Sequence, residues 1–361
     1  MKILVLMKRF GANKDMPLQD FGRQIRLFEN LKEHDIDFLC GDFTKLESKK
    51  LSRKNINYYI EPLGIFNFNK FLKRFDELVK ARKYDVIFAS TSPILGIIAH
   101  RYSKKYKIPM VYDLQDSFAA YDEYKIPFMS IVDRSIIKKS NIVICVSESL
   151  KKKVLGFRRK PTYVVHNGIE KGLFKPFDKD AARRKLNLPL KSRIIAYMGH
   201  LERLKGADIL LDAFNKLREF YPDTYLLLSG QVEKSTDIRK KNVIFRELPK
   251  REDVALAINS ADVAVIPNME NEFSRYCFPY KLAEYMACKA PIVATDIGDV
   301  SLMLKNYPGS LCRPDSYDMA TKIIGKLKKY KRISYDEEIK DLDWKVLSNK
   351  LNRIIKTSIK N

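Results

Sequence analysis

The chain has 361 residues, of which 45% are apolar and 31% charged, and it contains only 14 Gly and 15 Pro. This composition excludes collagen-like, low-complexity and largely disordered chains. The length predicts about two domains of ~100–200 residues, each large enough to bury its own core. The formal net charge is +24, from 68 Lys and Arg against 44 Asp and Glu, and this excess favours partners that carry phosphate groups.

Cysteine usage and hydropathy bear on the cellular compartment. The 5 cysteines are scattered and include no C-x-x-C pair, which argues against a disulfide framework and against a zinc site. The apolar stretch at residues 3–7 is too short for a signal sequence, and no later stretch reaches the ~18 apolar residues of a membrane span. We therefore expect a cytoplasmic protein whose membrane contact, if any, is peripheral.

Short β-branched runs alternate with longer helical patterns along the whole chain. Strands are expected first at residues 3–7, 38–39, 86–89, 110–112, 142–146 and 162–165, and then at 194–198, 225–228, 243–245, 263–266 and 292–294. Helices are expected at residues 209–220, 282–288 and 319–329. This alternation is typical of parallel strands joined by helices, so the predicted class is α/β with two Rossmann-like, doubly wound lobes.

The lobe boundaries follow from linker composition. Residues 170–177 are polar and contain both Gly and Pro, as a linker should, so the lobes are expected at 1–170 and 171–343. The tail, residues 344–361, has apolar side chains at helical spacing. It is expected to form a closing helix that packs back toward the N-terminal lobe.

The first segment with candidate functional residues is residues 197–211. A strand ends at Gly199, a basic loop with Arg203 and Lys205 follows, and Gly206 precedes an apolar-periodic helix. Backbone amides and the dipole at such a helix start suit a phosphate group, and the two side chains would add full charges. The alternative interpretation is a solvated turn with basic surface residues.

The second segment is residues 270–287. Pro279 is placed as the first residue of a helix, where its missing N–H costs nothing. Lys281 and Glu284, three positions apart, then share one helix face, and the carboxylate could accept hydrogen bonds from ribose hydroxyls. The alternative is an ordinary surface pair worth ~0.2–0.5 kcal/mol.

Taken in order, these segments resemble the motifs of the GT-B glycosyltransferases of retaining family 4, also called glycosyl transferases group 1. Residues 199–206 are similar to the family's Gly-Arg-Leu-x-x-x-Lys-Gly, and residues 281–287 to its Lys-Leu-x-Glu-Tyr-Met-Ala. Residues 143–150 resemble its valine-serine-glutamate strand end, and residues 164–170 its Asn-Gly-Val-Asp entry to the linker. The resemblance covers nearly the whole chain.

This resemblance implies two lobes facing across a cleft, a nucleotide-sugar donor held chiefly by the C-terminal lobe, and transfer with retention, without a cofactor or a metal ion. Lys205 would bind the donor diphosphate, with Arg203 as a second cation, and Glu284 would bind the ribose. The catalytic candidates are Lys205, Arg203, Asp116 and Gln115. The donor-binding candidates are Gly11, Gly199, His200, Lys205, Glu272, Tyr276, Phe278, Lys281 and Glu284. Gly11 would let the backbone approach the donor, or it is a plain turn residue.

The sequence departs from the family pattern at three positions. His200 stands where the family has arginine, which leaves Arg203 as a substitute or Lys205 alone. Tyr276 stands where the family often has a glutamate that contacts the sugar; Glu272 and Asn271 are the alternatives. Gln115 stands where many members have histidine; it can still hydrogen-bond a sugar, and Asp116, when ionised, can accept from an acceptor hydroxyl.

The acceptor is inferred from charge. Residues 45–110 carry 15 Lys and Arg against 5 Asp and Glu, and aromatic and basic side chains alternate there: Tyr58, Tyr59, Phe66, Phe68, Lys70, Phe71, Lys73 and Arg74. Such a surface is typical of docking on an anionic bilayer, where each nearby cation contributes about 1 kcal/mol. We expect a lipid-linked saccharide or glycolipid acceptor, cell-surface polysaccharide or glycoconjugate synthesis, and attachment to the inner membrane face. A solvated face over a core stripe is the alternative.

Three other functions compete with this reading. A basic nucleic-acid-binding protein would use the same charge, but the sequence has no such motif, and residues 1–170 carry 32 basic and 19 acidic side chains, so the charge is spread over both halves. A GT-B-like nucleotide-sugar epimerase would need acid/base carboxylates and a histidine that are not evident. A non-catalytic relative is compatible with the departures at Tyr276 and Gln115.

Overall fold

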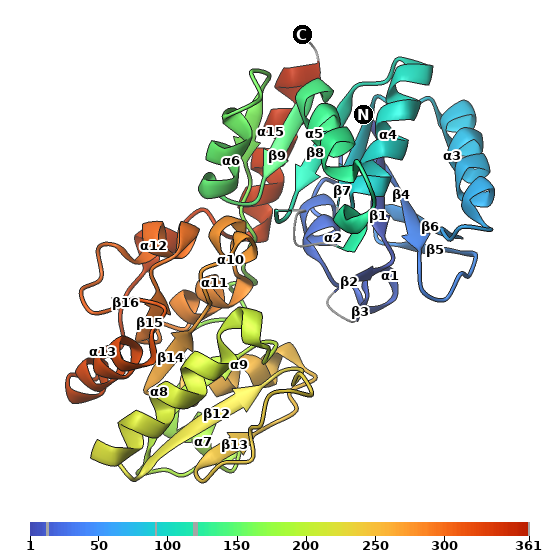
Figure 1. Cartoon of the computed structure of the whole chain (residues 1–361). Coiled ribbons are helices and arrows are strands. Elements are labelled where there is room, and N and C mark those ends of the chain that lie inside the picture. The colour runs from blue at the N-terminus through green and yellow to red at the C-terminus, as the bar shows by residue number, and fades with distance from the viewer. Residues whose placement is uncertain (12–13, 91, 118–121, 360–361) are drawn as a thin grey trace. The chain divides into compact units, whose positions relative to one another are not determined.

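The computed structural model describes residues 1–11, 14–90, 92–117 and 122–359. Contacts within the chain divide it into unit 1, which comprises Met1–His166 and Trp344–Asn361, and unit 2, which comprises Asn167–Asp343. Each unit is built on one large parallel sheet with helices against it (Figure 1). The two units are described separately below.

The large sheet of unit 1 has 8 strands in the order β10-β9-β8-β7-β1-β4-β6-β5, and β5 alone is antiparallel to its neighbour. Its strands are β1 (Lys2–Lys8), β4 (Asp35–Asp42), β5 (Lys49–Arg53), β6 (Ile56–Pro62), β7 (Val86–Ser90), β8 (Met110–Leu114), β9 (Ile142–Cys145) and β10 (Thr162–Val164). A small ribbon pairs β2 (Phe10–Gly11) with β3 (Lys14–Asp15). The parallel strands follow the Rossmann order, extended by β10.

The helices of unit 1 connect these strands. They are α1 (Met16–Gln19), α2 (Arg23–Phe28), α3 (Phe68–Arg82), α4 (Pro93–Tyr106), the 3₁₀ turn η2 (Asp122–Lys125), α5 (Met129–Lys139), α6 (Glu148–Leu155) and α15 (Trp344–Ile359). The C-terminal helix α15, red in Figure 1, contacts α2. Asn30 donates to Ser348, and His34 lies 2.8 Å from Asn352.

Unit 2 has a sheet of 6 parallel strands in the order β13-β12-β11-β14-β15-β16. Its strands are β11 (Arg193–Met198), β12 (Thr224–Ser229), β13 (Val243–Phe245), β14 (Val263–Ile266), β15 (Ile292–Thr295) and β16 (Leu311–Cys312). Numbered along the chain, this order is 3-2-1-4-5-6, the Rossmann arrangement, whose direction reverses between β11 and β14. The predicted α/β class with a doubly wound sheet in each half is confirmed.

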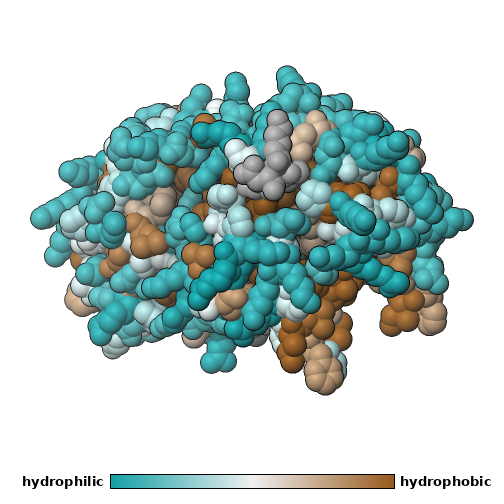
Figure 2. Space-filling view, turned by 90° about the horizontal axis from the view of Figure 1, so that it is seen from above, coloured by the Kyte–Doolittle hydropathy of each residue, from teal (hydrophilic) through white to brown (hydrophobic). Residues whose placement is uncertain are grey.

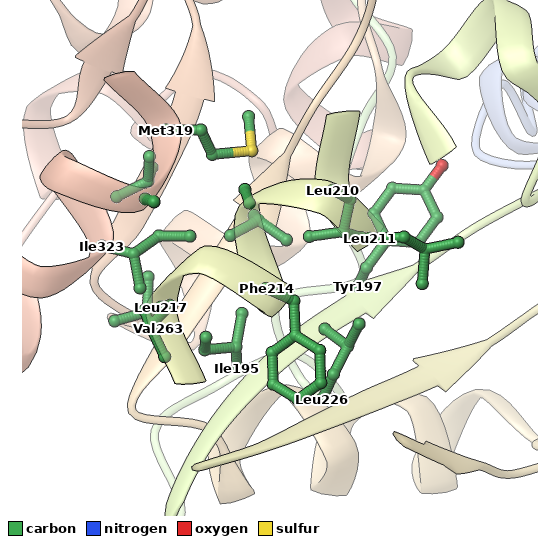
Figure 3. Packing of buried hydrophobic residues seen from close by; sticks show 14 of the residues in the cluster. Ile195, Tyr197, Leu210, Leu211, Phe214, Leu217, Leu226, Val263, Met319 and Ile323 are labelled. Atoms are coloured by element: carbon green, nitrogen blue, oxygen red, sulfur yellow. The ribbon is translucent and has the colours of Figure 1, made fainter. Parts of the chain in front are cut away.

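The helices of unit 2 are α7 (Lys179–Lys185), the 3₁₀ turn η3 (Arg203–Lys205), α8 (Ala207–Phe220), α9 (Arg251–Ser260), α10 (Glu272–Tyr276), α11 (Tyr280–Ala287), α12 (Gly298–Leu304), α13 (Ser316–Lys328) and α14 (Asp336–Ile339). Helices α8 and α13 pack together over the sheet, with Phe214, Leu217, Met319 and Ile323 buried against Ile195 (Figure 3). Burying each large apolar side chain of this kind stabilises the fold by ~1.5–3 kcal/mol, which fixes the strand ends that carry the site.

The structure corrects two local predictions. No strand is expected from the sequence between residues 45 and 62, which belong to the basic, aromatic-rich stretch 45–110. The structure forms the hairpin β5–β6 there, and β6, with inward-facing Ile56, Tyr58 and Ile60, is a full strand of the sheet. Pro279 is the N-cap of α11, not its first helical residue. In the described part of the chain, no helix combines the length and the apolar character that a bilayer crossing requires.

Candidate functional site

The predicted phosphate-binding loop of unit 2 lies at the point where the strand order reverses. It connects β11 to α8, and in doubly wound sheets ligands bind at the carboxyl ends of the strands beside this point. Gly206 has φ +77°, and a Cβ atom on it would lie 1.9 Å from the carbonyl oxygen of Pro267, directly after β14. Only glycine therefore allows the loop to pass so close to the end of β14.

A half-buried ammonium group occupies the space beside the end of β11. The Nζ atom of Lys281, on α11, donates a hydrogen bond of 3.0 Å to the Tyr197 hydroxyl and lies 4.2 Å from the centroid of that ring. A Cβ atom on Gly199 would lie 2.9 Å from this Nζ, so glycine makes room for the cation. Burial lowers the pKa of Lys281 to about 8.

The Lys281 ammonium is electrostatically unbalanced. Among the described residues, no carboxylate forms an ion pair with it; the charges of Glu284 and Glu202 act on it only from a distance. A desolvated cation without a counter-ion is costly. An anionic ligand at this point would supply the missing negative charge.

Tyr197 anchors this arrangement. Its ring packs in the core of unit 2 while its hydroxyl points away from the apolar cluster (Figure 3). The hydroxyl donates to the carbonyl oxygen of His200 at 2.9 Å and accepts from Lys281. Burial raises the pKa of Tyr197, so the hydroxyl stays protonated. Tyr285, on α11, accepts a 2.9 Å hydrogen bond from the backbone N–H of Met198, which joins α11 to the end of β11.

Lys205 is held in place by two neighbours. Its Nζ lies 2.8 Å from a carboxylate oxygen of Glu202 and 5.5 Å from the centroid of the Phe273 ring. Asn271, the N-cap of α10, donates a 2.9 Å hydrogen bond to the carbonyl oxygen of Leu204 and so tethers the loop. Glu202 also lies 3.5 Å from His200. The cation is thus positioned before any ligand binds.

Arg203 is arranged differently from Lys205. Its guanidinium is exposed and lies 3.8 Å from the exposed carboxylate of Asp208, and an exposed pair of this kind contributes ~0–1 kcal/mol. The structure therefore does not bring Arg203 into the cluster of Lys205, Lys281 and Tyr197.

Glu284 is buried on α11 and is engaged on one side only. Its Oε1 accepts a 3.1 Å hydrogen bond from Arg251, whose guanidinium also lies 3.6 Å from Glu170 and 4.9 Å from the centroid of the Phe174 ring. Burial raises the pKa of Glu284, and the charge of Arg251 opposes that rise. Within the described residues Oε2 has no hydrogen-bond partner, so this oxygen is the one that can accept from a ligand hydroxyl.

The remaining candidates in unit 2 differ in solvent exposure. Glu272 lies exposed in the first turn of α10, and Tyr276 is half-buried at the end of that helix. The ring of Phe278 is buried in unit 2, and a contact between this residue and a donor stays a prediction. Its carbonyl oxygen instead accepts a 2.7 Å hydrogen bond from Asn167.

Three candidates belong to unit 1. Gly11 ends the strand β2 and pairs with Lys14; a Cβ atom there would lie 3.0 Å from the Met16 sulfur, so this glycine has a local packing role. Gln115 follows β8, and its amide nitrogen donates to Ser90 at 2.9 Å and to Asp113 at 3.2 Å. Because both amide hydrogens are used internally, its carbonyl oxygen is the group left for a sugar hydroxyl.

A buried ion pair that the sequence analysis did not identify supports Gln115. Arg23 contacts the carboxylate of Asp113 at 3.1 Å, and it donates to the carbonyl oxygens of Val165 and His166 at 2.6 Å each. Asp116, the third candidate of unit 1, is half-buried and lines a cavity between α5 and α6. In the described ranges, no group of three or more His, Cys, Asp or Glu is arranged to hold a metal ion.

Two Rossmann-type sheets in one chain, each with polar groups gathered at its carboxyl edge, define the GT-B class. The chain is similar over its length to a sucrose-phosphate synthase from Thermosynechococcus elongatus, with a TM-score of 0.80 and 16% identity, covering 99% of this chain and 98% of that one. It is also similar to Anabaena HepE in complex with UDP-glucose, with a TM-score of 0.75 and 18% identity, covering 99% and 100%. These likenesses confirm the GT-B fold.

Two family models match the sequence: Glycosyltransferase Family 4 over residues 24–172 and Glycosyl transferases group 1 over residues 192–329. The chain belongs to the group 1 glycosyltransferases, as its motifs indicate. A D-inositol 3-phosphate glycosyltransferase of Mycolicibacterium smegmatis is 26% identical over 50% of this chain and 44% of that protein. A putative teichuronic acid biosynthesis glycosyltransferase of Bacillus subtilis is 28% identical over 64% and 58%. The chain spans about half the length of the curated relatives it matches.

Proposed function

We propose that this chain transfers a sugar, with retention, from a nucleotide-sugar donor to an acceptor hydroxyl, and that unit 2 binds the donor. The observation that carries the proposal is the half-buried Lys281 ammonium, which has no ion-pair partner among the described residues and lies beside Gly199 at the switch point. The structures of HepE with UDP and with UDP-glucose support a nucleotide-sugar donor.

The donor fits the site in three parts. The diphosphate pairs with the ammonium groups of Lys281 and Lys205, and Oε2 of Glu284 accepts from the ribose hydroxyls. His200 and Gly199 border the same loop end, and Glu272 and Tyr276 are proposed to contact the sugar. Because two side-chain cations take the negative charge, we propose a reaction that uses no metal ion or other cofactor.

The proposed chemistry needs no protein nucleophile. The bond between the anomeric carbon and the phosphate oxygen breaks toward an oxocarbenium-like state, while negative charge grows on the leaving diphosphate. The acceptor oxygen forms the new bond to that carbon on the same face, and its proton passes to the departing phosphate. The chain's part is to stabilise the developing charge with positioned cations. In unit 1, Gln115 and Asp116 are proposed to orient the acceptor.

The donor proposal is tested by nucleoside diphosphate binding across pH. We expect UDP, GDP or ADP to bind with a dissociation constant that is flat below about pH 8 and rises above it by up to about tenfold per unit, because the neutral Lys281 amine must gain a proton to pair with phosphate. Isothermal titration calorimetry from about pH 6.5 to 9.5 measures the slope, with a bound diphosphate expected to raise the pKa of Lys281.

Two variants separate this explanation from a general pH effect. Lys281→Arg keeps the charge over the whole range and should remove the slope, whereas Lys281→Met should weaken binding at every pH and also show no slope. If none of the three nucleotides binds the wild-type chain, the donor proposal fails. If binding occurs but its slope survives in both variants, Lys281 does not contact the diphosphate.

We further propose a lipid-linked saccharide or glycolipid as the acceptor, in polysaccharide or glycoconjugate synthesis at the inner face of the membrane. The relative named for teichuronic acid biosynthesis supports a role in polysaccharide synthesis. The structure revises the residues involved. Tyr58 and Phe71 are buried, and Arg74 pairs with Glu61 at 2.8 Å, so these three do not form a docking surface.

The apolar residues available for membrane contact lie just before α3. Ile65 and Phe66 are 92% and 98% exposed, which is far more than a solvated turn requires. Phe68, Lys70 and Lys73 are exposed directly after them. A fully exposed apolar pair flanked by cations is typical of a segment that enters the headgroup region of an anionic bilayer.

The double variant Ile65→Ser/Phe66→Ser is expected to lose at least about tenfold in affinity for vesicles of phosphatidylcholine and phosphatidylglycerol, since two large apolar side chains no longer leave water. Co-sedimentation measures binding, which should weaken with salt. The matched control is Phe220→Ser/Leu302→Ser, which removes two exposed apolar side chains from unit 2. Equal binding by both double variants and the wild type would contradict this docking surface.

A further inference from the structure

Unit 1 contains an apolar cavity that the proposed donor site does not use. It lies beside the carboxyl end of β8, between α5 and α6, and has a volume of about 350 Å³, within the range of small-molecule sites. Its apolar walls are Leu114, Ile137, Leu150, Val154 and Phe157. A cavity with such walls favours a hydrocarbon group over a sugar or a nucleotide.

The polar groups of the cavity are unequal. Asp133 is buried, and its carboxyl group already accepts hydrogen bonds from the hydroxyls of Tyr112, at 2.6 Å, and Tyr124. Burial raises the pKa of Asp133. Two cations line the cavity as well. The Arg134 guanidinium is exposed and lies 4.5 Å from the centroid of the Phe157 ring, and Lys153 donates to Ser117 at 3.1 Å. Asp116 contributes one half-buried carboxylate.

The surroundings of the cavity are strongly basic. Residues 125–160, which include α5 and α6, carry ten basic and two acidic side chains. The charge of this segment attracts anions, and the cavity walls attract hydrocarbon. A ligand that satisfies both has an apolar chain and an anionic head.

An exposed apolar edge adjoins the cavity. On α5, Ser130, Arg134 and Ile137 line the cavity at helical spacing, whereas Ile131, on the same helix, is 66% exposed and Phe128, just before it, 74% exposed. Ile126, Val132 and Leu155 are exposed too. Figure 2 shows brown groups projecting from a face that is mostly hydrophilic. Apolar side chains around a cavity rim allow an acyl or isoprenoid chain to enter without crossing a polar surface.

We propose that this cavity binds the apolar chain of a phosphate-bearing amphiphile, with the phosphate at Arg134 and Lys153. This inference rests on the proposed function in one respect: it identifies the amphiphile as the lipid-linked acceptor. Binding of an amphiphile to the cavity does not itself require sugar transfer. Arg134 suits the head group because its planar guanidinium makes two parallel hydrogen bonds to phosphate oxygens.

Decyl phosphate below its critical micelle concentration tests the proposal by isothermal titration calorimetry. We expect saturable binding at one site per chain, at least tenfold tighter than decanol, which lacks the anionic head, and than inorganic phosphate, which lacks the chain. No saturable binding of decyl phosphate overturns the proposal. Equal affinity for decyl phosphate and decanol overturns the assignment of the head group to Arg134 and Lys153.

Variants locate the ligand. Ser130→Trp places a large ring at the mouth of the cavity and should weaken decyl phosphate binding at least tenfold, whereas Lys139→Trp, at an exposed position of the same helix that neither lines the cavity nor belongs to its apolar edge, should change it less than twofold. Arg134→Gln, at an exposed position that tolerates substitution, should weaken binding of decyl phosphate but not of decanol. If Ser130→Trp and Arg134→Gln both leave binding unchanged, the amphiphile binds elsewhere and the proposal fails.

The same samples separate this inference from the proposed function. Thermal melting checks the fold of each variant. Decyl phosphate binding without any nucleotide binding or sugar transfer would support the cavity and contradict the transferase. Nucleotide binding without decyl phosphate binding would support the donor site and contradict the proposed amphiphile cavity.

Discussion

Replacing Lys205 by alanine is expected to lower kcat/KM for sugar transfer about 10²–10³-fold, equivalent to ~2.7–4 kcal/mol of transition-state stabilisation, while the chain stays folded. Negative charge grows on the leaving diphosphate, and an ammonium group already held by Glu202 and Phe273 need not reorganise to meet it. Steady-state kinetics with the nucleotide sugar identified by binding measure the loss, and thermal melting checks the fold.

Lys216 offers a matched control for the loss of a lysine. Its side chain is 24% exposed against 25% for Lys205, and it also pairs with a carboxylate, Asp212, at 3.1 Å and lies 4.2 Å from an aromatic ring, that of Tyr317. Lys216→Ala should change kcat/KM by less than about twofold, because Lys216 lies on α8 outside the cluster. Equal losses in the two variants would show that Lys205 acts through stability alone.

Arg203→Ala tests the alternative that the basic loop acts as a whole. Arg203 is exposed and loosely paired with Asp208, so its removal should cost far less than that of Lys205. A loss as large as that of Lys205→Ala would mean that the arginine moves toward the diphosphate when the donor binds.

The local sequence pattern was sufficient to predict most of the parallel strands, but it failed at β6, where many charged residues obscure the alternation of apolar side chains. Residues 243–245 and 263–266 form strands with the predicted bounds, because short β-branched runs between turn residues have few other structures open to them. In β6, Ile56, Tyr58 and Ile60 alternate as a strand requires, but the surrounding lysines and aromatics favoured a surface interpretation. The alternation was the correct signal there.

The candidate site shows the same division between local and long-range information. The positions of Lys205, Lys281 and Glu284 follow from short motifs, yet the groups that position them are distant in sequence: Tyr197 precedes Lys281 by 84 residues, and Arg251 precedes Glu284 by 33. Only the tertiary fold, which brings α11 within hydrogen-bond reach of β11 and of Arg251 on α9, determines these pairs. No spacing rule within one segment predicts them.

Glu284→Gln is expected to remove most of the chain's preference for ribose. The wild type should bind its nucleoside diphosphate about 10–100-fold more tightly than the 2′,3′-dideoxy analogue, because a hydrogen bond to a charged acceptor contributes ~1.5–3 kcal/mol. In the variant the preference should fall to a few-fold, since a neutral amide replaces the carboxylate whose Oε2 is available. Calorimetry on both proteins with both ligands closes the double-mutant cycle.

Asp262→Asn controls for the loss of a buried, arginine-paired carboxylate elsewhere in unit 2. Asp262 and Glu284 are both 7% exposed, and Asp262 lies 2.7 Å from Arg183, as Glu284 lies 3.1 Å from Arg251. Breaking either pair should lower the melting temperature, because the remaining arginine, buried at Arg183 and partly exposed at Arg251, loses a buried counter-ion. Only Glu284→Gln should reduce the ribose preference; a reduction of the same size in both variants would assign Glu284 to the stability of α11 and leave the ribose without its proposed partner.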